Sequence, residues 1–201
     1  MSVPTATSVP TTPPATATAP APSAADPRLL VGEPVSLDLL NTRWNLSGVR
    51  QDLLEGVDGL AVWLASNGLQ DRFTADEDTL RRTRAARDAL AALVDDPGEP
   101  RATARVDEVL GHGRIRATLT AEGPGERSEF ADPAWGPGWT AAHDYLGLLR
   151  AAPDRIRVCA HESCVLRFFD TSRNGTRRWC SMALCGNRAK ASRHYARGKR
   201  A

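Results

Sequence analysis

The sequence of 201 residues has no long run of apolar side chains, no cysteine before residue 159 and only two lysines. No stretch approaches the roughly 20 apolar residues of a membrane-spanning helix, which argues against a membrane protein. The absence of cysteine from so much of the chain argues against the scattered disulfides of a secreted scaffold. Hydrophobic residues still make up 41% of the chain, so it is not wholly disordered.

The first 25 residues also lack charged side chains. They contain six prolines, six threonines and seven alanines, a composition that cannot bury apolar surface and that predicts a disordered tail over residues 1–26. This segment has neither the basic nor the apolar region of a secretory signal. We therefore expect a cytoplasmic protein, in which thiols stay reduced and available to a metal.

The near-neutral net charge of +2 conceals two segments of opposite charge. Residues 1–154 hold 14 arginines and 22 acidic residues, a net charge of −8. Residues 155–201 hold 12 basic and two acidic residues, a net charge of +10. Such asymmetry favours a nucleic-acid partner, and it also allows a contact between the acidic body and the basic C-terminal module.

Residues 27–152 have the pattern of a mainly helical α+β domain. Apolar spacing predicts helices over 57–66, 101–110 and 139–149, and a capping box at 74–77 predicts the start of another. Residues 35–41 alternate only partly, so helix and strand both stay open there. Strict alternation over 114–120 predicts a strand, paired with 128–132 across a glycine-rich loop.

All the cysteines form two C-x4-C pairs, Cys159 with Cys164 and Cys180 with Cys185, separated by fifteen residues. Two short loops of this kind let four thiolates converge on one tetrahedral zinc ion. A module of this size has little to bury, and structural zinc supplies on the order of 10 kcal/mol to such a fold. The alternative is four buried or redox-active cysteines. Residues 153–201 are therefore predicted to form a treble-clef-like finger, with 165–169 and 177–179 as a hairpin around Asn174-Gly175.

A basic helix is expected to follow the last cysteine, over about residues 187–197. Stacked cations on a helix are unfavourable unless they face a polyanion such as DNA. The predicted DNA-contacting residues are Asn187, Arg188, Lys190, Arg193 and Arg197, supported from the hairpin by Arg173, Arg177 and Arg178. A solvated surface and a protein partner are the alternatives.

Two stretches resemble known families. The run from Cys180 through Cys185-Gly186-Asn187-Arg188 to Lys190 resembles the CGNR zinc finger, and Cys159 to Asn174 is similar to its upstream half. Residues 32–42 resemble the start of the ABATE domain, which is described as a stress-induced transcription regulator and commonly precedes that finger. The resemblance implies a bacterial DNA-binding regulator that holds one structural Zn²⁺ through the four cysteines.

The body offers one further candidate site and no catalytic motif. A polar cluster beside apolar residues could line a ligand pocket, although caps of a helix or turn use the same residue types; it comprises Asp38, Asn41, Thr42, Arg43 and Trp44. Paired carboxylates, a Ser/His/Asp set and a phosphate loop are all missing, so we expect no enzyme. The leading hypothesis is a stress- or metabolite-responsive transcriptional regulator whose finger binds DNA. In this hypothesis the body senses the signal or forms a homo-oligomer. The alternatives are a protein-interaction module and a small-molecule-binding body anchored by the finger.

Overall fold

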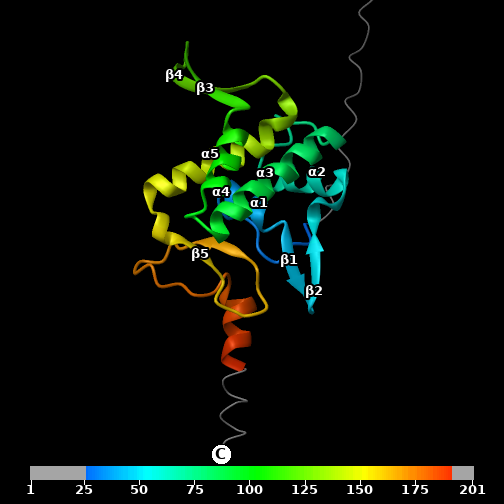
Figure 1. Cartoon of the computed structure of the whole chain (residues 1–201), viewed down its shortest axis with the longest axis vertical. Coiled ribbons are helices and arrows are strands. Elements are labelled where there is room, and N and C mark those ends of the chain that lie inside the picture. Colours follow the sequence, from blue (N-terminus) through cyan, green and yellow to red (C-terminus); the bar gives the residue numbers. More distant parts are fainter. Residues whose placement is uncertain (1–25, 192–201) are drawn as a thin grey trace, which may run out of the picture.

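The computed structural model describes residues 26–191. Within that range, the body contains five α-helices that surround one apolar core (Figure 1). They are α1 (Val35–Leu40), α2 (Val57–Ser66), α3 (Glu77–Asp95), α4 (Pro100–Leu110) and α5 (Gly136–Ala151). The central helix α3 packs on both α4 and α5, and α1 packs on α5. Residues 35–40, where helix and strand competed, are helical, with Leu37 and Leu39 fully buried.

The start of α3 differs from the prediction. The N-cap is Asp76, whose carboxylate accepts the backbone N–H of Thr79 at 2.8 Å. The predicted capping box, based on the hydroxyl of Thr74 and the carboxylate of Glu77, is wrong, because Glu77 is already the first residue of the helix.

We expect Asp76→Ala to lower the free energy of unfolding by about 1 kcal/mol, the usual effect of losing an N-cap. The backbone hydrogen bond from Thr79 lowers the pKa of Asp76, so this stabilisation is present at neutral pH and is lost as the pH falls below the ordinary value of 3.8. Urea unfolding at pH 7 measures the loss. Asp71→Ala, in the preceding exposed turn, is the control and should change stability by less than about 0.5 kcal/mol.

Three two-stranded antiparallel sheets complete the part of the chain that the structure describes. In the first, β1 (Arg43–Leu46) pairs with β2 (Val49–Asp52). This hairpin was not predicted, although its turn carries a signal: Ser47 and Gly48 both adopt positive φ, at 51° and 82°, as the tight turn of a hairpin requires. The hairpin lies beside α1 on the side of the body that faces the finger (Figure 1).

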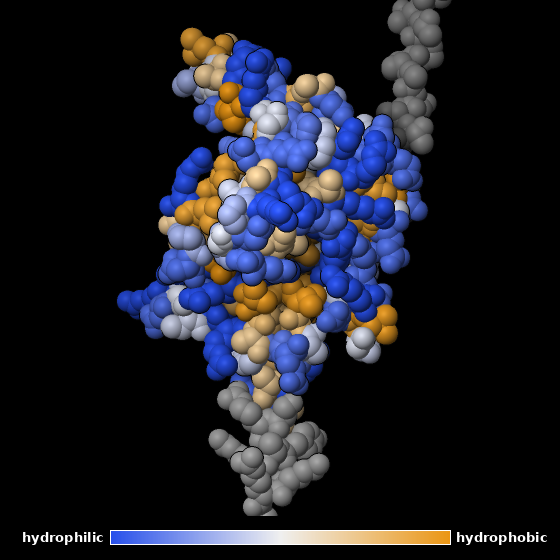
Figure 2. All heavy atoms as spheres, in the orientation of Figure 1, coloured by the Kyte–Doolittle hydropathy of each residue, from blue (hydrophilic) through white to orange (hydrophobic). Residues whose placement is uncertain are grey.

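The second sheet is a long hairpin at the opposite end of the molecule from the finger (Figure 1). Its strands are β3 (Gly113–Thr120), as predicted, and β4 (Gly123–Phe130). The partner strand was predicted at 128–132 but begins earlier. The glycine-rich stretch 123–125, which was predicted to be a loop, belongs to the strand, and the turn is only Ala121-Glu122. Leu119 near this turn is 82% exposed, and apolar residues are visible at this end in Figure 2.

The C-terminal region forms the third sheet, between β5 (Ile156–Val158) and β6 (Arg167–Phe169). It then runs irregularly to a π-helical turn, η4 (Met182–Gly186), followed by α-helical residues 187–191. The predicted hairpin between 165–169 and 177–179 is wrong, because β6 takes β5 as its partner and residues 177–179 form no strand. The fold class is confirmed: a helical body with small antiparallel sheets precedes a region with four clustered cysteines.

Candidate metal centre

The first cysteine pair lies in the loop between β5 and β6. Cys159 directly follows β5, and its backbone N–H donates to the carbonyl of Leu166 at 3.0 Å, which closes the loop. Within the loop, the N–H of Cys164 donates to the carbonyl of His161 at 2.8 Å and forms a tight turn. The chain therefore returns both thiols of the C-x4-C pair to one side of the short sheet.

The second pair comes from the start of the C-terminal helical segment. Cys180 precedes η4 and Cys185 lies inside it. Ser181 caps this turn, since its side chain accepts the N–H of Leu184 and its carbonyl accepts the N–H of Cys185 at 3.0 Å. The helical turn thus brings Cys185 back over Cys180.

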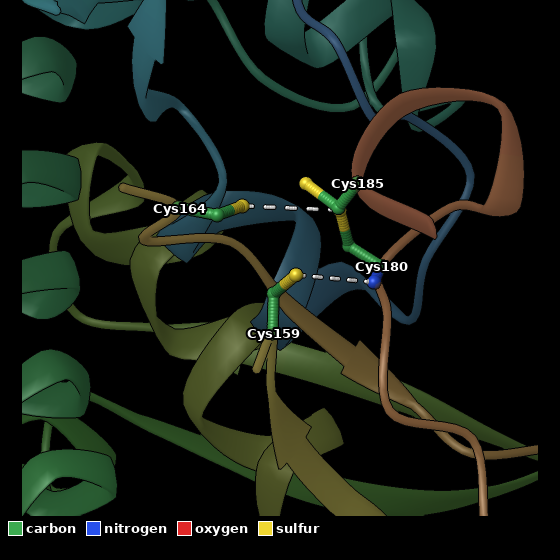
Figure 3. A group of neighbouring side chains, drawn as sticks. All are labelled: Cys159, Cys164, Cys180 and Cys185. Atoms are coloured by element: carbon green, nitrogen blue, oxygen red, sulfur yellow. Dashed lines mark hydrogen bonds between the residues drawn. The ribbon is translucent and has the colours of Figure 1, made fainter. Parts of the chain in front are cut away.

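The four side chains point toward a common centre (Figure 3). Their sulfur atoms all lie within 4.8 Å of one another. The Sγ atom of Cys180 is 3.8 Å from that of Cys164 and 3.6 Å from that of Cys185. A tetrahedron of sulfurs around a zinc ion, with bonds of about 2.3 Å, has edges of about 3.8 Å. The donor set and its spacing therefore fit one zinc ion.

The electrostatics of the thiols also favour a cation. A hydrogen bond from the Cys180 thiol lowers the pKa of Cys164 to about 5, while the same hydrogen bond raises the pKa of Cys180. Burial raises the pKa of Cys185 to about 11. The cluster therefore cannot ionise fully by itself, whereas a divalent cation at its centre would stabilise every thiolate.

Two family models match the chain. The ABATE model, "Putative stress-induced transcription regulator", matches residues 33–152, which is more than half of the chain. The chain belongs to the ABATE family. The CGNR zinc finger model matches residues 155–198, directly after the ABATE domain. No curated protein matches the chain.

The prediction of a four-cysteine site for one structural zinc ion is confirmed. In this ABATE protein the ligands are Cys159, Cys164, Cys180 and Cys185. The rest of the CGNR motif surrounds the site. Gly186 is buried, and a Cβ there would meet Met182 and Trp179, while Asn187 is exposed. Arg188 folds back toward the cysteines, its Nη2 atom 3.3 Å from the Sγ atom of Cys185.

The predicted DNA-contacting residues fall into three groups. The exposed group comprises Arg173, Arg178, Asn187, Arg188 and Lys190, and of these Arg188 also bonds Cys185. Arg177 is half-buried and structural, since its guanidinium lies 4.2 Å from the Phe168 ring centre and donates to the carbonyls of Trp179 and Cys180. Arg193 and Arg197 lie outside the described residues.

The predicted ligand-pocket residues lie around α1 and β1, where they contact protein groups, and all except the partly exposed Arg43 are buried. The carboxylate of Asp38 pairs with Arg28 at 2.5 Å and accepts hydrogen bonds from Asn67 and the backbone of Gly32. These contacts hold the segment before α1 against the body.

Thr42 and Arg43 belong to a second buried network. Thr42 accepts a hydrogen bond from Arg87 at 2.8 Å, and Arg87 also makes two hydrogen bonds to Asp52. Burial alone would raise the pKa of Asp52. The pKa is lowered instead by the hydrogen bonds and charge of Arg87, together with a hydrogen bond from Arg43. The network fixes the base of the β1–β2 hairpin.

Asn41 and Trp44 join the body to the finger. The side chain of Asn41, which is fully buried, donates to the carbonyl of Arg167 and accepts the backbone N–H of the same residue, both at 2.8 Å. Both the NH₂ group and the oxygen of the Asn41 amide are therefore hydrogen-bonded to the backbone of β6. Trp44 on β1 packs into the finger core, which contains three of the cysteines, Leu166 and Phe168.

Several interface residues were not identified from the sequence. Glu33 accepts the N–H of Phe169 at 2.9 Å and lies 3.7 Å from Arg177, and Arg167 pairs with Asp95. The acidic body and the basic finger are therefore in direct contact. No sequence signal could reveal these pairs, because their members lie more than 70 residues apart.

Asp170 was also missed, although it has a local signal. It is fully buried and accepts the N–H groups of Ser172 and Arg177 at 2.9 and 2.8 Å. The Asp-x-Ser spacing is typical of a side chain that closes a turn on the backbone two residues on. Asp170 thereby holds the loop that leads from β6 to the second cysteine pair.

In the part of the chain that the structure describes, no helix is long and apolar enough to cross a membrane.

Proposed function

We propose that this ABATE protein is a transcriptional regulator whose zinc finger binds DNA. The observation that carries the proposal is the net charge of +10 over residues 155–201, concentrated on the metal-centred module. The finger has only two acidic residues, Glu162 and Asp170, and Asp170 is buried with its carboxylate bonded to the backbone. In the described part of the finger, Arg167 and Arg177 face carboxylates of the body, and the other cations have little opposing charge, which favours a polyanionic partner.

One of the exposed cations, Arg178, lines an open groove. The groove has a volume of about 420 Å³ and is lined by Thr176, Arg177, Arg178, Trp179, Ser181 and Met182. The guanidinium of Arg178 lies 5.3 Å from the Trp179 ring centre, and Met182 is half-exposed. Helical residues 187–191, with Asn187 and Lys190, project away from the body (Figure 1). A DNA backbone approaching this end would meet the helix before it met the acidic body (Figure 1).

The body is proposed to sense a stress signal or a metabolite. Support comes from Asn41, which caps the C-terminal end of α1 and bonds to β6, because a change in the position of α1 would reach the finger through this residue. Oligomerisation is a second way in which the body could act, and the proposal assigns no catalysis to the chain.

We expect Arg178→Ala and Lys190→Ala each to weaken DNA binding about equally on all sequences, if each cation contacts phosphate. Each variant should reduce the slope of log affinity against log salt by about 1, because one fewer counterion is released. Fluorescence anisotropy with a pool of random duplexes at several salt concentrations measures both effects. Arg150→Ala, an exposed cation on α5, is the matched control and should leave binding unchanged.

Two outcomes of the binding measurement would contradict the proposal. Binding that is absent at low salt in the zinc-loaded protein would contradict it. Capture of an acidic protein, with no DNA binding at any salt concentration, would favour the protein-interaction alternative.

A further inference from the structure

Arg188 is placed to act on the metal centre. It follows Cys185 by three residues and Leu184 by four, and these are the spacings at which residues on successive turns of a helix are neighbours. Its Nε atom donates to the carbonyl of Leu184 at 3.2 Å, while Nη2 donates to the Sγ atom of Cys185 at 3.3 Å. One planar guanidinium therefore holds both the backbone of η4 and a metal-ligating sulfur.

The charge of the centre explains why a cation is useful there. Four thiolates around one divalent ion leave an excess of two negative charges. Cys180 and Cys185 are fully buried, and an uncompensated charge is costly where water is excluded. A hydrogen bond from a guanidinium offsets this cost, because charge-assisted bonds are about twice as strong as neutral ones.

The other donors near the sulfurs do not supply this charge. The backbone N–H of Cys180 donates to the Sγ atom of Cys159 at 3.4 Å, but it is neutral. Arg177, the other guanidinium beside the cysteines, donates to the carbonyl of Cys180 and not to its sulfur. Within residues 26–191, Arg188 is thus the charged group that is bonded to a ligand sulfur.

We propose that Arg188 is a positioning residue of the zinc site, which holds the Cys185 thiolate in place and neutralises part of its charge. This role differs from the DNA contact that the sequence predicted for the same residue. It rests on the metal centre alone and would hold whether or not the finger binds DNA. Residues that support a metal ligand in this way typically contribute 10- to 100-fold to metal affinity.

The proposal is tested by measuring zinc affinity of the full-length chain in competition with a chromophoric chelator. Arg188→Ala is expected to weaken zinc binding by about 10- to 100-fold. Arg188→Lys, which keeps the charge but not the planar fork, should restore part of this loss, and Arg188→Gln, which keeps an N–H donor without the charge, should restore less. Lys190→Ala removes an equivalent charge from the same helical segment and is the matched control, with zinc affinity unchanged.

A spectroscopic measurement separates this role from a merely structural one. In the cobalt-substituted protein, the thiolate-to-metal charge-transfer band reports the electron density on the sulfurs. We expect it to shift in Arg188→Ala and to stay constant in Lys190→Ala. Wild-type zinc affinity and an unshifted band in Arg188→Ala would overturn the proposal, and so would a loss of DNA sequence preference as the only effect of that variant.

Discussion

Removal of zinc is expected to unfold the finger and also to loosen the part of the body that contacts it. The finger core consists mainly of Leu166, Phe168, Trp44 and the cysteines themselves. Without zinc, the four cysteines lose their bonds to the metal, and on the order of 10 kcal/mol of folding free energy is lost. The strands β5 and β6 should then separate, and Asn41 should lose the backbone of Arg167 to which it is bonded.

Hydrogen exchange followed by mass spectrometry, before and after treatment with a strong chelator, measures this effect. Protection from hydrogen exchange should fall over residues 156–169 and over β1. It should stay unchanged in α3 and α4, because these helices belong to the separate body core. Zinc should restore protection and magnesium should not. Cys180→Ser should resemble the chelated protein, since every cysteine of the chain is a ligand. Unchanged protection after verified metal removal would contradict the prediction.

Truncation of Trp44 is expected to have the second largest effect, and to act on both parts of the molecule. Trp44 belongs to the body strand β1, is 5% exposed, and packs in one cluster with Cys159, Cys180 and Cys185. Trp44→Ala should lower the free energy of unfolding by about 3–5 kcal/mol, the range for a large buried aromatic residue. It should also weaken zinc binding, because the cavity left by the indole adjoins the cysteines.

Urea unfolding and chelator competition together check this prediction, with two controls. Trp44→Phe should recover most of the stability. The indole Nε1 atom has no hydrogen-bond partner among the described residues, so replacing tryptophan with phenylalanine breaks no hydrogen bond. Trp135→Ala removes an aromatic residue that stacks on His112 at 3.9 Å, far from the cysteines, and should leave zinc affinity unchanged. If Trp44→Ala binds zinc as tightly as the wild type, the body does not support the metal centre.

The shared core has a consequence for domain organisation. The two family matches divide the chain between residues 152 and 155. The hydrophobic core of the finger nevertheless crosses this boundary, since Leu29, Leu30 and Leu53 of the body also pack against it. A finger expressed without the body would expose Phe168 and the backbone of β6. For this reason the experiments proposed above use the full chain.

Local features of the fold were predictable from the sequence. The helices α2, α4 and α5 follow the spacing of apolar residues, and β3 follows strict alternation, because both patterns are properties of short segments. The β1–β2 hairpin was overlooked, although Ser47-Gly48 marks its turn. The pairing of β6 could not be predicted, because Arg177–Trp179 and Ile156–Val158 were both near enough along the chain to serve as its partner.

The metal ligands and the separation of charge could be identified from the amino-acid sequence. Two short cysteine loops can converge on one ion whatever surrounds them, and net charge depends on composition alone. The contacts of individual side chains became clear from the three-dimensional fold. Asn41 and Trp44 join the body to the finger, and Arg188, although exposed, bonds a sulfur of the metal site. The physical reason is that a hydrogen bond or a packed contact depends on which groups the fold brings together, and in the case of Asn41 and Arg167 these lie 126 residues apart.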